Sequence, residues 1–191
     1  MDLTLSAGNT LTVQQTVFGF GGKLLELIGQ KSEDRVVTIP DTWPDTSSTY
    51  GSDNFLFVPK SIYAELATTG STHLSLGLFD QTVSDALSWV DRLNALAAKV
   101  GVSTGTETTG EDVLLVTRTN DSGTAWVRLN GTLVEVNTIE AGNRFATYEI
   151  LENADAPVIL SLTLTPAARA EFSVLSAFEG FAVSEIKTTS P

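Results

Sequence analysis

The 191-residue chain has no cysteine and only one histidine. The absence of cysteine excludes disulfide bonds, thiolate nucleophiles and metal sites built on cysteine, so packing and strand pairing must stabilise the fold. The single histidine, His73, excludes a site with several histidine ligands and would have to serve any histidine-dependent triad. It falls on the polar side of a predicted strand without an acidic neighbour in sequence, which indicates an ordinary surface position.

Basic residues are scarce as well. The chain has 11 Lys and Arg against 23 Asp and Glu, which gives a formal net charge of -12. No block of Lys and Arg occurs anywhere, and this argues against nucleic acid and anionic lipid as partners. Solubility explains the acidity, with calcium binding and docking to a basic partner as the alternatives.

Long apolar runs are also missing. No window approaches the roughly 18 consecutive apolar residues of a membrane span. The first six residues have neither the basic nor the apolar region of a secretory signal. We therefore expect a protein that is made in the cytoplasm and has no membrane partner. Free termini usually fray, so ordered ends at Met1 and Pro191 would indicate packing against neighbours in an assembly, with packing in a crystal lattice as the alternative.

Alternation of apolar and polar residues is the main pattern that is present. With 42% apolar and 18% charged residues, the chain has the composition of a folded globular protein. Its length allows a sizeable core to form without disulfide bonds. Strands are predicted at 3–5, 11–17, 35–39, 54–58, 72–79, 112–119, 125–129, 132–136, 145–151, 158–165, 171–178 and 181–187.

Two segments have helical rather than strand periodicity. Residues 83–100 place apolar side chains at three- and four-residue steps, and Gly101 stands where a left-handed helix stop is expected. A shorter helix is predicted at 59–67, with Pro59 at its first position, Ile62 and Leu66 facing inward and Gly70 beyond its end.

Asn130 and Gly131 give the strongest local signal in the chain. Both residues accept the positive φ that a two-residue type I′ hairpin turn requires, and alternating strands flank them. The predicted register puts Val127 opposite Val134 on the core face. The other face then carries Trp126, Arg128, Leu133 and Glu135, with a diagonal ion pair expected between Arg128 and Glu135.

About a dozen short strands and one long helix predict a mainly β fold, an antiparallel β-sandwich of the jelly-roll kind. We expect a single domain over 1–191. The alternative is a domain boundary in the Ser-, Thr- and Gly-rich loop at 103–111.

The outer face of the hairpin is a candidate protein interface. Trp126, Leu133 and Arg128 are residue types that protein contacts use. Burial under the 83–100 helix or a second sheet is the alternative. The Gly-rich segment around Phe18 and Phe20 is a second candidate, because its apolar rings alternate with glycines and can anchor on a neighbouring chain.

One loop mixes carboxylates with aromatic rings. Asp41, Asp45 and Asp53 are candidate calcium ligands, whereas Trp43 and Tyr50 are candidate sugar-stacking rings. The spacing of an EF-hand is absent, and a plain surface loop is the simplest reading. The residues at 120–123, Asn-Asp-Ser-Gly, suit a turn.

No residue set carries a catalytic or cofactor signature. The glycines at 19–22 do not have the spacing of a phosphate-binding loop, and no pair of carboxylates stands out for glycoside hydrolysis. We therefore expect neither an enzyme nor a bound cofactor or metal.

The sequence favours a virion structural protein, a bacteriophage capsid decoration or tail component that forms homo-oligomers or contacts other capsid or tail proteins. This rests on the absence of an export signal and of cysteine, together with a Thr- and Gly-rich β pattern. The alternative is a carbohydrate-binding or adhesin module at the extracellular surface, with a glycan as its partner.

Overall fold

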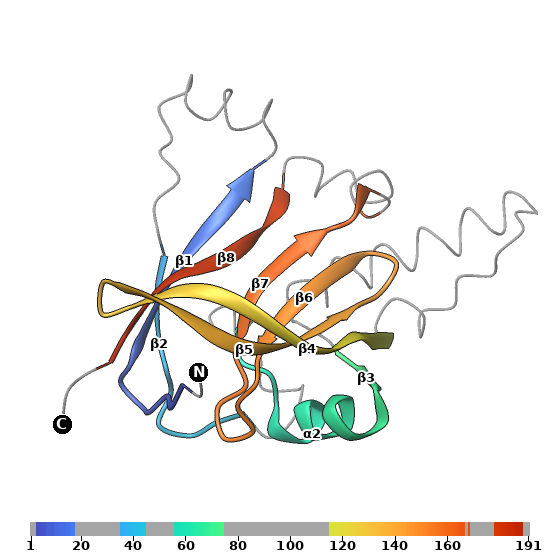
Figure 1. The fold of residues 1–191 in the computed structure, drawn as a ribbon, viewed down its shortest axis with the longest axis horizontal. Coiled ribbons are helices and arrows are strands. Elements are labelled where there is room, and N and C mark those ends of the chain that lie inside the picture. Colours follow the sequence, from blue (N-terminus) through green and yellow to red (C-terminus); the bar gives the residue numbers. More distant parts are fainter. Residues whose placement is uncertain are drawn as a thin grey trace, which may run out of the picture.

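A computed structural model describes residues 3–17, 35–44, 56–74, 115–166, 168 and 178–188. These residues are mainly β, as predicted (Figure 1). The described elements are β1 (Thr10–Val17), β2 (Arg35–Thr38), α2 (Lys60–Thr69), β3 (Ser71–His73), β4 (Leu115–Leu129), β5 (Thr132–Gly142), β6 (Ala146–Leu151), β7 (Ile159–Leu164) and β8 (Phe178–Lys187).

The strands form one sheet in the order β2-β1-β8-β7-β6-β5-β4-β3. Strands β4 to β8 follow one another as an antiparallel meander, and the end of β4 then pairs with β8. The sheet therefore closes into a five-stranded barrel. Because an up-and-down meander of five strands ends in the direction in which it began, the closing contact between β4 and β8 must be parallel, as observed.

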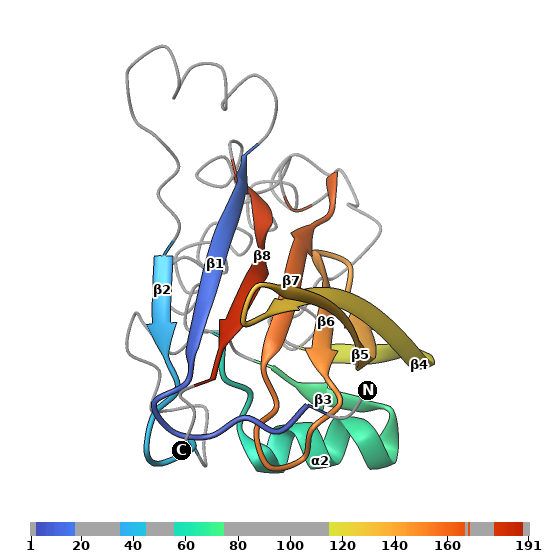
Figure 2. The ribbon, with the colours of Figure 1, turned by 60° about the vertical axis from the view of Figure 1, so that its left-hand side comes forward.

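This closed barrel corrects the predicted jelly-roll-like sandwich. A sandwich needs two sheets that face each other, whereas here strands β4 to β8 pair in sequence order and the single sheet rolls up (Figure 2). The remaining strands extend the sheet beyond the barrel. β1 pairs with β8 and carries β2 at its other edge, and β3 pairs with the beginning of β4.

Irregular pairing in β4 lets this long strand bend. The predicted turn at 120–123 is wrong, because β4 runs through it as a strand with register shifts on either side of Asn120. Gly123 lies against β5, where an added Cβ would be 2.7 Å from the hydroxyl of Thr138. The residues Asn-Asp-Ser-Gly thus form a bulge rather than a chain reversal, since a bulge needs the same backbone freedom as a turn.

Strand β8 is continuous where the sequence predicted a break before Phe181. Gly180 has a φ of 152°, and a Cβ there would be 1.9 Å from the carbonyl oxygen of Leu162 on β7. The glycine therefore permits a close approach of the two backbones within the sheet.

The short predicted helix is confirmed as α2. Pro59 occupies the N-cap, and Gly70 ends the helix in the left-handed conformation with its N–H donating to the carbonyl of Leu66 at 3.1 Å. Leu66 is buried as predicted, while Ile62 is half-buried and Tyr63 faces the core instead. Figures 1 and 2 show α2 beside β3 at one end of the sheet.

Two predicted strands are not strands in the structure. Leu3 and Leu5 are buried but lie in a segment without regular secondary structure before the turn at Gly8, which has a φ of 80°. In the described part of 54–58, Phe57 makes only an isolated bridge with Val158. The predicted helix at 83–100, the loop at 103–111 and the two chain ends lie outside the described residues, as does most of the predicted strand at 171–178.

The core lies between the inner faces of the barrel strands and the segments that pack on them. Its largest fully buried side chains are those of Phe57, Leu11, Leu56, Leu66, Ile139, Ile150, Leu151, Ile159, Leu162, Ile186 and Val58. Among the described helices, none is long and apolar enough to cross a membrane.

Candidate protein interface on the β4–β5 hairpin

The Asn130-Gly131 turn forms as predicted. Asn130 has a φ of 50° and Gly131 a φ of 83°, the positive values that a two-residue hairpin turn needs. Leu129 pairs with Thr132, and Val127 pairs with Val134, so the predicted register is confirmed.

The two faces of this hairpin differ sharply in exposure. On the inner face Val127 and Val136 are buried. On the outer face Trp126 keeps 63% and Leu133 54% of their surface exposed. The helix at 83–100, which the alternative of burial invoked, lies outside the described residues. Trp126 and Leu133 are diagonal neighbours across the two strands, and exposed apolar side chains that lie together form a patch of the kind that marks a candidate contact surface.

The tip of the hairpin is fastened to the end of β8. The N–H of Asn130 donates to the carbonyl of Ile186 at 2.9 Å. The Asn130 side chain also donates to the hydroxyl of Thr188 at 2.8 Å and accepts from the Thr188 N–H at 3.0 Å. Figure 1 shows the hairpin crossing the end of β8. Its outer face is therefore presented in a fixed position.

Charged residues flank the exposed apolar pair. Arg128 lies on the same face as Leu133 and directly opposite it, and Glu135 lies opposite Trp126. The predicted diagonal ion pair is not among those formed by the described residues. Instead, the guanidinium of Arg128 donates to the carbonyl of Gly131 at 3.5 Å.

The outer face continues from the hairpin across the neighbouring strands. Arg128 pairs with Glu185 of β8, Glu185 pairs with Thr12 of β1, and Thr12 pairs with Val36 of β2. Since directly opposed residues share a face of a sheet, Val36, which is 62% exposed, lies on the same side as Leu133. The candidate interface therefore spans five strands.

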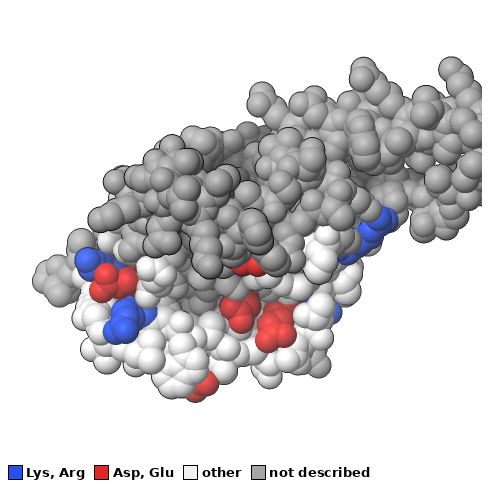
Figure 3. Space-filling view, turned by 90° about the horizontal axis from the view of Figure 1, so that it is seen from above, with Lys and Arg blue, Asp and Glu red and all other residues white. Residues whose placement is uncertain are grey.

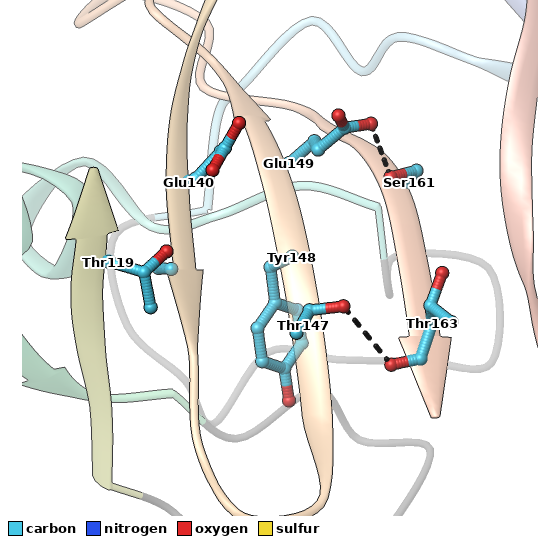
Figure 4. A pocket seen from close by; sticks show the side chains of 8 residues that line it. Thr119, Glu140, Thr147, Tyr148, Glu149, Ser161 and Thr163 are labelled. Atoms are coloured by element: carbon cyan, nitrogen blue, oxygen red, sulfur yellow. Dashed lines mark hydrogen bonds between the residues drawn. The ribbon is translucent and has the colours of Figure 1, made fainter. Parts of the chain in front are cut away.

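A second feature is a polar hollow of about 410 Å³ on the barrel wall (Figure 4). It is lined by Thr119, Glu140, Ala141, Thr147, Tyr148, Glu149, Ser161 and Thr163. Glu140 of β5 and Glu149 of β6 are direct cross-strand partners. The Ser161 hydroxyl donates to a carboxylate oxygen of Glu149 at 2.6 Å and so fixes its orientation.

Sequence reasoning did not find this hollow. The sequence signal that could have revealed it is the alternation of polar and apolar residues in β6 and β7. This alternation puts four polar residues on one side of the sheet: Thr147, Glu149, Ser161 and Thr163. Recognising Glu140 as the neighbour of Glu149 also required the pairing of β5 with β6. Chemically, carboxylates and hydroxyls on one wall can accept and donate hydrogen bonds to a polyhydroxylated ligand.

The predicted ligand loop is described only in part. Asp41 is exposed. Trp43 is half-buried, donates its indole N–H to the carbonyl of Val58 at 2.8 Å and packs edge-on against Phe57 at 5.1 Å between ring centroids. The described contacts thus tie Trp43 to the core. Its predicted companions Asp45, Tyr50 and Asp53 lie outside the described residues, as do the interface candidates Phe18 and Phe20.

His73 is exposed on β3, as expected for a surface histidine. Within the described ranges, no three His, Asp or Glu side chains come together as metal ligands. Figure 3 shows basic and acidic side chains interspersed over the described part of one face.

No protein-family model, curated protein or solved structure matches the chain.

Proposed function

We propose that this chain is a non-enzymatic structural protein that acts through protein–protein contacts, as a virion component such as a bacteriophage capsid decoration or tail protein. The exposure of Trp126 and Leu133 on the outer face of the hairpin carries the proposal. Trp and Arg dominate the energetic centres of protein interfaces, and this face presents both beside a leucine.

The fixed position of the hairpin supports the same function. Binding loses less free energy to ordering when the contact surface is already held in place. The hydrogen bonds of Asn130 with Ile186 and Thr188 hold the tip before any partner arrives. This arrangement suits repeated, identical contacts in an assembly.

The virion setting is supported by the character of the sequence. The chain has no cysteine, no basic block and a β-rich pattern with many threonines and glycines. A protein that assembles in a reducing cytoplasm cannot rely on disulfide bonds and depends on packed surfaces instead.

A carbohydrate-binding or adhesin module at the cell surface is the second candidate. The polar hollow favours it, because Glu140, Glu149 and Ser161 offer hydrogen-bonding groups suited to sugar hydroxyls. In this alternative the chain acts as a monomer and the hairpin face has no partner.

The two functions are separated by the assembly state of the purified chain and of a double variant, Trp126→Ala with Leu133→Ala. We expect the wild-type chain to form an oligomer in light scattering. We expect the variant to be monomeric with an unchanged circular dichroism spectrum, since both side chains are more than half exposed. Leu115→Ala, at the other end of β4 and 37% exposed, is the matched control and should leave the oligomer intact.

A variant that still assembles contradicts the proposal, and one that unfolds shows that the two side chains are structural. A wild-type chain that stays monomeric and binds sugar supports the carbohydrate-binding alternative.

A further inference from the structure

Four side chains on the hairpin's outer face form a checkerboard. Trp126 lies opposite Glu135, and Arg128 lies opposite Leu133. Residues two apart on a strand point to the same side, so all four share the outer face. One diagonal of the square is therefore apolar, Trp126 with Leu133, and the other is charged, Arg128 with Glu135.

This pattern is self-complementary under a two-fold axis. If the axis lies in the plane of the contact and runs along the apolar diagonal, Trp126 and Leu133 each meet their own copy. The rotation exchanges the two corners of the charged diagonal, so Arg128 of each copy lies over Glu135 of the other. An isologous contact needs a surface of this kind, because the same patch must serve both partners.

We infer that the hairpin face pairs with the same face of a second copy of this chain, with two reciprocal ion pairs between Arg128 and Glu135. The inference rests on the proposed function and specifies its partner and its symmetry. Within the described part of its own chain, Arg128 makes no ion pair, and neither does Glu135, so both charges are available to the other copy.

Charge supports a second copy as the occupant. Two chains of net charge -12 repel each other, so contact is favourable only where the local charge is balanced. The hairpin face is balanced, because Arg128 offsets Glu135. Beside it on β8, Lys187 offsets Glu185 at 3.4 Å. A basic partner would have no excess of carboxylates to bind here, and an acidic partner would find no excess of basic groups.

A charge reversal tests the reciprocal pairs. The two-fold axis generates each contact twice. Either Arg128→Glu or Glu135→Arg therefore brings two like charges together at both positions in the dimer. We expect either single variant to weaken dimerisation in sedimentation experiments, raising the dissociation constant on the order of 100-fold. The double variant restores opposite charges and should return to within about tenfold of the wild-type value. Lys60→Glu on α2 makes the same charge change as Arg128→Glu and should leave the dimer unchanged.

Cross-linking provides a second test that does not depend on charge. The native chain has no cysteine, so Leu133→Cys introduces the only thiol. A residue on the two-fold axis meets its own copy, and two sheets packed face to face lie about 10 Å apart, which is too far for a disulfide but within reach of a short bismaleimide. A short bismaleimide should therefore link Leu133→Cys into dimers rapidly. The exposed control Lys60→Cys should not link at the same concentration.

Failure of the inference can be told apart from failure of the proposed function. If the chain assembles and loses its assembly in the Trp126 and Leu133 double alanine variant, but the double charge reversal does not restore dimerisation, the two-fold pairing is wrong and the assembly function stands. If Leu133→Cys links no faster than Lys60→Cys, the pairing is likewise overturned. A wild-type chain that is monomeric at every concentration overturns both.

Discussion

At the scale of single residues, Thr138 contains a buried hydroxyl without a hydrogen-bond partner in the described part of the chain. Burying an unpaired polar group costs about 1–3 kcal/mol, and an apolar residue of the same shape avoids this loss. We expect Thr138→Val to raise the free energy of unfolding by about 1 kcal/mol, measured by urea denaturation.

Thr72 provides the matched control for this substitution. It is also buried, but its hydroxyl donates to a carboxylate oxygen of Glu65 at 2.7 Å. Thr72→Val removes a satisfied hydrogen bond and should lower the free energy of unfolding by about 1–2 kcal/mol. Equal destabilisation by the two substitutions would show that the Thr138 hydroxyl is paired in solution.

At the scale of elements, the hairpin turn allows a test of backbone conformation alone. An added Cβ at Gly131 meets nothing within 4 Å, so only its positive φ of 83° opposes a larger residue. We expect Gly131→Val to destabilise the fold by about 1–3 kcal/mol, because a β-branched residue is strained at positive φ. Gly131→Asn should cost clearly less, since asparagine tolerates this region. Thermal unfolding of the two variants measures the difference, and equal midpoints would contradict the turn assignment.

Elements with a local cause were predictable from sequence. The hairpin follows from Asn130 and Gly131 between alternating strands, and α2 follows from Pro59 and Gly70 at its two ends. The segment at 120–123 was misread because turn-forming residues also permit a bulge. Only the pairing of β4 with β5 determines which of the two forms. The same holds for Gly180, whose role depends on the approach of β7.

At the scale of the whole molecule, formation of the core buries Tyr148 of β6, and this burial raises the pKa of its phenol above the ordinary value of 10.0. The folded state then retains a proton that the unfolded state releases above about pH 10. The contribution of Tyr148 to the free energy of unfolding is therefore fully present below pH 10 and is lost as the pH rises further. We expect the free energy of unfolding to fall progressively as the pH rises above about 10.

The variant Tyr148→Phe checks this dependence. It removes the titrating group and should flatten the alkaline fall in stability. Part of the fall should remain, because burial, followed by the charge of Glu152, also raises the pKa of Tyr63. An identical pH profile for wild type and variant in urea denaturation would mean that Tyr148 does not contribute.

Sequence alone determined the features that depend on neighbours along the chain. These are the β class, the register of the hairpin, the placing of Trp126 and Leu133 together on its outer face, and the exclusion of cysteine and multi-histidine chemistry. Tertiary structure decided the rest. Closure into a barrel depends on β4 meeting β8, the hollow depends on Glu140 and Glu149 lying on paired strands, and Trp43 lies against Phe57. Each of these joins separate segments whose contact no local pattern encodes, since strand pairing depends on the packing of the whole sheet.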